Sequence, residues 1–291
     1  MRRGWRKSPS TRSLGRSFSS IGPNRPASIM DGYDGLKDFW KRCIERAPAY
    51  EKYKQANVLY PSSFPFTRHW GPFQFALLQS PTQTEIDLLE FMEGAQMAVE
   101  LVTRTYYEED LRKYALSLPK LTRLAILENT GEFYEAMQAL QTEGEPDCVK
   151  LMRRGVSKVC FEAIVMSIQN SNNAMHAVDL IQLDIDKMHL DNVKFHIVPR
   201  SIIQGSRAFR TYASVENLEE GTQNLEKEDI TEELLELRVI SQSKEHIKVY
   251  ADGNKKTLTR PNRASWAFAS CVTTPEQLDW RMADIHLHTI D

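Results

Sequence analysis

Residues 235–253, LELRVISQSKEHIKVYADG, decide the fold class of this chain. Apolar and polar residues alternate over 235–239 and again over 246–249, which is the period of a strand with one buried face. The Asp252-Gly253 pair that follows is a hairpin-turn signal. Four other short segments have the same period: 193–197, 209–215, 266–268 and 285–287. We therefore expect a run of antiparallel strands in the C-terminal part of the chain.

The part of the chain before these strands has the period of helices. Apolar residues recur in steps of three and four from Leu88 to Tyr106 and from Val149 to Met166,. The first of these helices is expected to begin at Ser80-Pro81-Thr82, and the second is expected to follow Pro146 as one helix that Ser167–Ala174 ends. Weaker helical patterns cover 36–53 and 111–133. Helices followed by strands predict an α+β fold in which the helices cover one face of a curved antiparallel sheet.

The first 30 residues differ in composition from the rest of the chain. They contain seven basic residues, seven serines and no acid. An Arg-rich, Ser-rich and acid-free start is typical of a mitochondrial transit peptide, and Arg16-Ser17-Phe18-Ser19 is similar to a matrix-processing site. The alternative is a disordered basic tail. We divide the chain into a transit peptide (1–30), an N-terminal extension (31–80) that packs on the domain or touches a membrane surface or a partner, and a main domain (81–291).

Charge is unevenly distributed in the remainder. The whole chain has 37 basic and 39 acidic residues, so removal of the seven N-terminal basic residues leaves a net charge of about −9. Residues 216–233 hold eight acids against one lysine, and we expect them to form an exposed acidic loop,. The loop is either merely solvated or a docking strip for a basic partner, with Glu219, Glu220, Glu228 and Asp229 as candidate contacts.

Two basic clusters could meet phosphate groups, although ordinary surface charge explains them as well. The first contains Arg153 and Arg154 with Lys150 and Lys158. The second contains Lys255, Lys256, Arg260 and Arg263. Because the mature chain would be an anion, we do not expect DNA as a partner.

Catalytic and metal-binding patterns are not recognisable in the sequence. The chain has no Gly-rich phosphate loop after a strand, no Gly-x-Ser-x-Gly elbow and no His-Glu-x-x-His helix,. Its four cysteines are scattered without a Cys-x-x-Cys pair, so we expect free thiols. We interpret His286 and His288 as a solvated strand face and Asp184-Ile185-Asp186 as a polar loop. No apolar stretch approaches the length of about 18 residues that a membrane span needs. We predict a non-enzymatic protein without metal or cofactor.

Three segments resemble the Tim forty-four-like domain family. The helix at 89–98, LEFMEGAQMA, is similar to the opening helix of that family, with an aromatic residue followed by Gly-Ala. Trp266-Ala267-Phe268 is similar to its Trp-x-Phe strand, and residues 279–285, DWRMADI, are similar to its closing strand. The middle of the chain departs from the family, because 167–190 and the acidic block look longer than its connections. The candidate signature or pocket residues are Phe91, Gly94, Ala95, Trp266, Phe268, Trp280 and Ile285.

This resemblance implies a nuclear-transport-factor-two-like cone, in which helices and a curved antiparallel sheet surround a pocket. It also implies a mostly non-catalytic mitochondrial protein. The chain looks most like the subfamily of matrix AAA peptidase-interacting proteins, which implies a matrix adaptor or chaperone peripheral to the inner membrane. Its expected partners are the matrix AAA protease and inner-membrane client proteins such as a small calcium-uniporter subunit. A mitoribosome-associated protein is the alternative. The side chains of Trp266 and Trp280 are better explained as core anchors than as ligand contacts, and Gly94 is most simply explained by close approach of another backbone.

Overall fold

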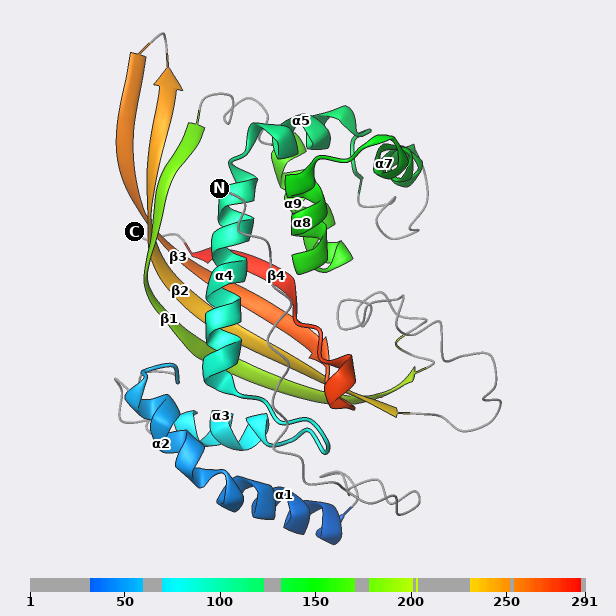
Figure 1. Cartoon of the computed structure of the whole chain (residues 1–291), viewed down its shortest axis with the longest axis vertical. Helices are drawn as coiled ribbons and strands as arrows, with labels where there is room; N and C mark the ends of the chain where they lie inside the picture. Colours follow the sequence, from blue (N-terminus) through cyan, green and yellow to red (C-terminus); the bar gives the residue numbers. More distant parts are fainter. Residues whose placement is uncertain are drawn as a thin grey trace.

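The computed structural model describes residues 32–59, 70–122, 132–170, 178–200, 203, 231–251 and 254–288. Helices precede strands along the chain, and the strands form a curved sheet (Figure 1). The elements are α1 (Tyr33–Glu45), α2 (Ala47–Gln55), α3 (Trp70–Leu78), α4 (Leu88–Tyr106), α5 (Glu109–Ser117), α7 (Glu132–Glu143), α8 (Asp147–Gly155), α9 (Lys158–Asn170), β1 (Val178–Pro199), β2 (Thr231–Ala251), β3 (Asn254–Cys271), the short 3-10 helix η3 (Pro275–Gln277) and β4 (Arg281–His288).

The four strands form one antiparallel sheet in the order β1-β2-β3-β4. This arrangement confirms the predicted α+β class. Ala251 pairs with Asn254, so β2 and β3 are joined by two residues at the predicted Asp252-Gly253 turn, which lies outside the described residues. The expected strand at 209–215 also lies outside them. The prediction of a polar loop at Asp184-Ile185-Asp186 is wrong, because these residues belong to β1, which begins at Val178.

Apolar residues at every second position of β2 and β3 form the buried inner face of the sheet. Leu235, Leu237 and Val239 are buried, and they lie opposite Ser270, Phe268 and Trp266 of β3. Helix α4 lies across this inner face (Figure 1) and packs its own stripe of buried residues into the same core. That stripe consists of Leu88, Met92, Ala95, Val99 and Val102, as the sequence period predicts.

Two helix boundaries differ from the predictions. Helix α4 begins at Leu88 rather than near Ser80, because the Asp87 side chain caps it by accepting a hydrogen bond of 2.8 Å from the Leu89 N–H,. The single helix expected after Pro146 is two helices, α8 and α9. The break between them pairs with β4: Val156 forms a parallel bridge to Met282, and the Ser157 N–H donates to the Met282 carbonyl at 2.8 Å.

The N-terminal extension packs on the main domain. The hydroxyl of Tyr53, in the second helix of the extension, accepts a hydrogen bond of 3.2 Å from the Leu88 N–H, which joins α2 to the start of α4. The connection of the extension to the sheet runs through the outer edge of β1. The Leu190 N–H donates to the Val58 carbonyl at 2.7 Å, and the Gln74 amide and the Trp70 indole N–H donate to the Asp191 carbonyl at 2.6 and 3.2 Å. The extension therefore covers the middle of an edge strand whose backbone groups would otherwise lack partners.

Candidate functional site

The residues that carry the family resemblance come together where α4 meets the sheet. The Phe91 ring of α4 lies edge-on to Phe268 of β3 and to Trp280, with ring centroids 5.6 and 4.8 Å apart. The Trp266 indole N–H donates to the Ser241 hydroxyl at 2.8 Å, and Ile285 packs partly buried against the same core. Three segments far apart in the sequence thus form one aromatic packing unit. Phe91, Phe268 and Trp266 are buried, so these side chains act as core anchors in this structure,.

Gly94 and its neighbour Ala95 lie in different environments. Ala95 is buried in the core, whereas Gly94 is exposed. A Cβ built at Gly94 would meet no heavy atom within 4 Å, so the expected close approach of another backbone is wrong for the described residues. The Gly-Ala pair has its alanine, not its glycine, at the packing interface.

An uncovered apolar surface lies on α1. Tyr33, Leu36, Trp40 and Ile44 recur in steps of three and four, and we name these four residues the α1 stripe. Their exposed fractions are 81%, 44%, 55% and 72%. At about 100° per residue they span an arc of about 80° on the helix. Exposed large apolar side chains gathered on one helix face mark an interaction surface, whereas single ones do not.

The α1 stripe is the open half of a wider apolar arc. Phe39 and Cys43, on the adjoining part of the helix surface, are buried against the protein. Two contacts to Gln79 support this placement: the Arg42 Nε donates to its carbonyl at 3.0 Å, and the Arg46 guanidinium donates to its side-chain oxygen at 2.7 Å. Arg46 also forms an ion pair with Glu85 at 2.9 Å. The helix is therefore held with half of its apolar arc facing outward.

Charged residues on α1 are ordered around the stripe. Lys37 and Lys41 are exposed and lie next to it on the helix surface,. Asp34, Asp38 and Glu45 lie beyond the lysines, on the side away from the stripe,. An apolar surface bordered by lysines suits a surface that is apolar inside and negatively charged outside.

The two arginines proposed for partner docking have different roles. Arg153 is half-buried, and its guanidinium bonds both carboxylate oxygens of Glu145 at 3.0 and 3.2 Å. It also lies over the Phe161 ring, 6.0 Å from the centroid. Arg154 is exposed. The fold thus uses Arg153 internally, and Arg154 alone of the two faces solvent freely.

The end of the predicted acidic loop is part of the sheet. Glu219, Glu220, Glu228 and Asp229 lie outside the described residues. Glu232 and Glu233, however, belong to β2 and are only 3% and 0% exposed, so the prediction of an exposed loop is wrong at this end. Distant donors explain their burial: the Thr82 N–H and hydroxyl both donate to the Glu233 carboxylate at 2.8 Å,. This contact also ties the segment before α4 to the sheet.

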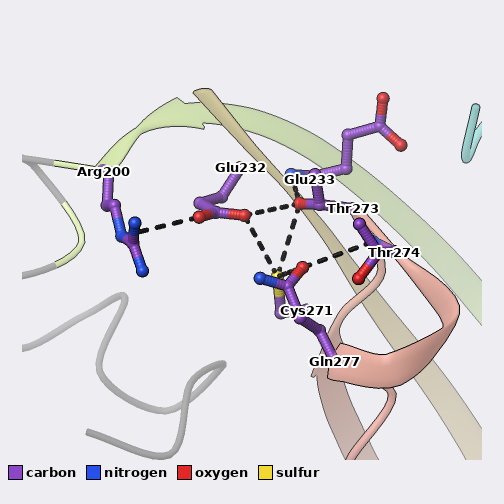
Figure 2. Close-up of polar contacts among 7 residues, drawn as sticks. All are labelled: Arg200, Glu232, Glu233, Cys271, Thr273, Thr274 and Gln277. Atoms are coloured by element: carbon purple, nitrogen blue, oxygen red, sulfur yellow. Dashed lines mark hydrogen bonds and ion pairs between the residues drawn. The ribbon is translucent and has the colours of Figure 1, made fainter. Parts of the chain in front are cut away.

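A buried polar network surrounds Glu232 at the same end of the sheet. Figure 2 shows its carboxylate between Arg200 and Cys271. Arg200 approaches one carboxylate oxygen at 3.6 Å, and the Thr273 hydroxyl donates to the other at 2.6 Å. The Cys271 thiol lies 3.5 Å from the Glu232 oxygen that accepts from Thr273. It also lies 3.4 Å from the side-chain oxygen of Gln277. The network joins the ends of β1, β2 and β3 to η3.

Cys271 is not activated by this network. Burial raises the pKa of the thiol, and the nearby Glu232 carboxylate raises it further,. A protonated thiol is a hydrogen-bond donor and a poor nucleophile. We interpret the network as a structural joint of the sheet end. All four cysteines are free, in agreement with their scattered positions in the sequence.

Histidines and carboxylates do not gather into a metal site within the described part of the chain. His286 is exposed and its Nε2 lies 2.6 Å from Asp284, while the side chain of His288 is outside the description. On the other end of the sheet, His246 lies between Asp184 at 3.1 Å and Thr259 at 3.0 Å. These contacts join neighbouring strands on one face of the sheet.

The described residues define an α+β protein in which helices cover an antiparallel sheet of the four strands β1 to β4. Searches against protein-family models, curated proteins and solved structures find no match to it. The α1 stripe is a candidate interaction surface whose residues sequence reasoning did not single out within the extension. Its signal was present in the spacing of Tyr33, Leu36, Trp40 and Ile44, but the spacing alone does not show which part of an apolar arc stays open.

Proposed function

We propose that the chain is a non-catalytic adaptor or chaperone of the mitochondrial matrix that works at the surface of the inner membrane. It binds the matrix AAA protease and assists the sorting or assembly of small inner-membrane proteins, such as a calcium-uniporter subunit. Its main domain is a nuclear-transport-factor-two-like cone of the Tim forty-four-like family. The resemblance of residues 89–98, 266–268 and 279–285 to that family supports this assignment. The packing of Phe91 on Phe268 and Trp280 agrees with a common structural role for the three segments.

The observation that carries a peripheral membrane location is the α1 stripe. Tyr33, Trp40 and Ile44 expose most of their side chains to solvent, and Lys37 and Lys41 border them. Aromatic and aliphatic side chains insert at the boundary of headgroups and acyl chains, while lysines reach the anionic headgroups. None of the helices in the described ranges is long and apolar enough to cross a membrane. The proposed contact therefore uses a helix that lies on the bilayer surface.

The proposed function is tested by affinity capture of the tagged full-length protein from mitochondria at low and high salt. Recovery of the matrix AAA protease in both conditions supports an adaptor. A double variant, Trp40→Ser with Ile44→Ser, should shift the protein from the membrane fraction to the soluble matrix fraction and retain the protease. Failure to recover the protease from mitochondria that contain it would refute the adaptor role.

A mitoribosome-associated protein is the second candidate. It is favoured by Lys248, Lys255, Lys256 and Arg260 at the end of the β2–β3 hairpin, which form no ion pair within the described residues. Basic side chains of this kind contact RNA phosphates on ribosome surfaces. Salt-resistant co-sedimentation with the large ribosomal subunit supports this candidate, and sedimentation apart from ribosomes excludes it.

A further inference from the structure

At the end of the sheet that carries the β2–β3 hairpin, the outermost strands are β1 and β3, and their outer edges differ. The β1–β2 pairing contains three register shifts, and the extension covers the β1 edge at Leu190 and Asp191. On β3, the next strand β4 pairs only with Arg263–Ala269. Residues 254–262 of β3 therefore have β2 on one side and no strand on the other within the described part of the chain. We name residues 255–261 the β3 outer edge.

The backbone groups that point away from β2 follow from the register. The β2–β3 pairing runs without a shift from Leu234–Cys271 to Ala251–Asn254. Ala251 and Asn254 flank a two-residue connection, so they exchange hydrogen bonds, and every second residue of β3 after Asn254 does the same. The N–H and C=O groups of Lys255, Thr257 and Thr259 consequently point outward. Pro261 falls in the same set, where its missing N–H costs the β2–β3 ladder nothing.

The β3 outer edge is open to solvent. Residues 255–261 are all exposed, and the end of the β2–β3 hairpin extends past the helices (Figure 1). Within the described part of the chain, none of these residues has a hydrogen bond or ion pair outside the β2–β3 ladder except that of the Thr259 hydroxyl to His246. Lys255, Thr257 and Thr259 thus offer backbone donors and acceptors at every second position of a strand without a bulge. Strand addition requires an edge of this kind.

The charge of this edge selects between possible occupants. Lys255, Lys256 and Arg260 lie on it, and the Lys255 and Lys248 ammonium groups are each 5.6 Å from the Tyr250 ring centroid. A second copy of the same edge would place these cations against one another, so like-charge repulsion opposes self-pairing. An extended segment rich in Asp or Glu would gain both backbone hydrogen bonds and charge attraction. A nucleic acid would use the charges but not the outward N–H and C=O pairs of the strand.

We propose that the β3 outer edge binds an extended acidic segment of a partner protein, which adds to the sheet as a further strand beside Lys255–Thr259. Pro261 and the start of the β4 pairing at Arg263 limit the added strand to the hairpin end. This site is separate from the α1 stripe and does not depend on the proposed function.

The test uses the full-length protein and a fluorescent peptide that alternates Glu with Val. Thr257→Pro removes one outward N–H without affecting the β2–β3 ladder, and Thr257→Val is its matched control. We expect Thr257→Pro to weaken binding at least about fivefold, and Thr257→Val to leave it unchanged. The double variant Lys255→Glu with Lys256→Glu should weaken it at least about tenfold. Hydrogen exchange at the Thr257 and Thr259 amides should be fast in the free protein and should slow when the peptide binds.

Controls on the peptide separate strand addition from charge attraction alone. A peptide of the same sequence with N-methylated backbone amides should bind much more weakly, and a Lys-Val peptide should not bind. Equal binding of the N-methylated peptide, or unchanged exchange at Thr257 and Thr259, would overturn the proposal. Binding of a single-stranded RNA that is lost in the Lys255→Glu/Lys256→Glu variant but kept in Thr257→Pro would assign the edge to nucleic acid instead. Thermal unfolding of each variant shows that the sheet remains intact.

Discussion

Loss of the α1 stripe should release the protein from anionic membranes. Trp40 and Ile44 are 55% and 72% exposed, so more than half of each side chain is available to a bilayer. Complete burial of a large apolar side chain stabilises by about 1.5–3 kcal/mol. Scaled by the exposed fractions, the double variant Trp40→Ser with Ile44→Ser should lose about 2–4 kcal/mol of membrane affinity. This loss corresponds to a partition coefficient lower by about 30- to 900-fold.

The assay is sedimentation of the full-length protein with vesicles of phosphatidylcholine that contain phosphatidylglycerol. Lys37→Gln and Lys41→Gln should each weaken binding about fivefold, because a lysine near an anionic surface contributes about 1 kcal/mol. Their effect should disappear on vesicles of phosphatidylcholine alone. Raising the salt concentration should weaken wild-type binding and leave the contribution of Trp40 and Ile44 largely unchanged.

Met97 provides the matched control for this prediction. It is 59% exposed on α4, away from α1, so Met97→Ser removes one large exposed apolar side chain from another place, as each single substitution of the double variant does on α1. The control should bind vesicles as the wild-type protein does. If Met97→Ser weakens binding as much as the α1 variant, or if the α1 variant binds normally, the assignment of the stripe is wrong. Dimer dissociation in the α1 variant, measured by analytical ultracentrifugation, would show instead that a second copy covers the stripe.

Three further predictions concern stability and reactivity. Gly94→Ala should stabilise the protein by about 1 kcal/mol, because Gly94 lies inside a helix with open space around it,. The Gly144→Ala variant, at a φ of +127°, should destabilise it, and thermal unfolding compares the two,. Burial lowers the pKa of His189 below 6.5, so the unfolded chain takes up this proton more readily, and stability should fall as the pH drops through about 6.5,. Urea unfolding of the wild type and of His189→Asn checks this, because the variant should show a smaller pH dependence. Native thiols should react slowly with a disulfide reagent at neutral pH, since burial raises the pKa of Cys148 to about 11 and also raises that of Cys271,. Cys148, the only half-buried thiol, should react first, and rapid labelling of Cys271 would show that the network in Figure 2 opens.

The fold class was available from the sequence because periodicity reports which residues share a face. The alternation at 235–239 and the three-and-four spacing from Leu88 to Tyr106 both lead to buried faces in the structure. The positions at which helices begin and end were harder to predict from the sequence. A proline near Ser80 resembles a helix start, but the helix begins where Asp87 can cap it and where the Tyr53 hydroxyl meets the Leu88 N–H. The second of these contacts comes from a distant helix that local sequence does not reveal.

The candidate surfaces depended on tertiary structure to a greater degree. By itself, the sequence determined that residues 36–53 have a helical pattern, that 216–233 is acidic and that the hairpin end is basic. Only the tertiary structure decided that the apolar arc of α1 is half covered, that Glu232 and Glu233 are buried and that β4, within the described residues, does not pair with residues 254–262 of β3. The physical reason is that periodicity and composition describe one segment at a time. Whether an apolar stripe, a carboxylate or a strand edge stays exposed depends on which distant segment supplies its cover, its hydrogen-bond donors or its neighbouring strand.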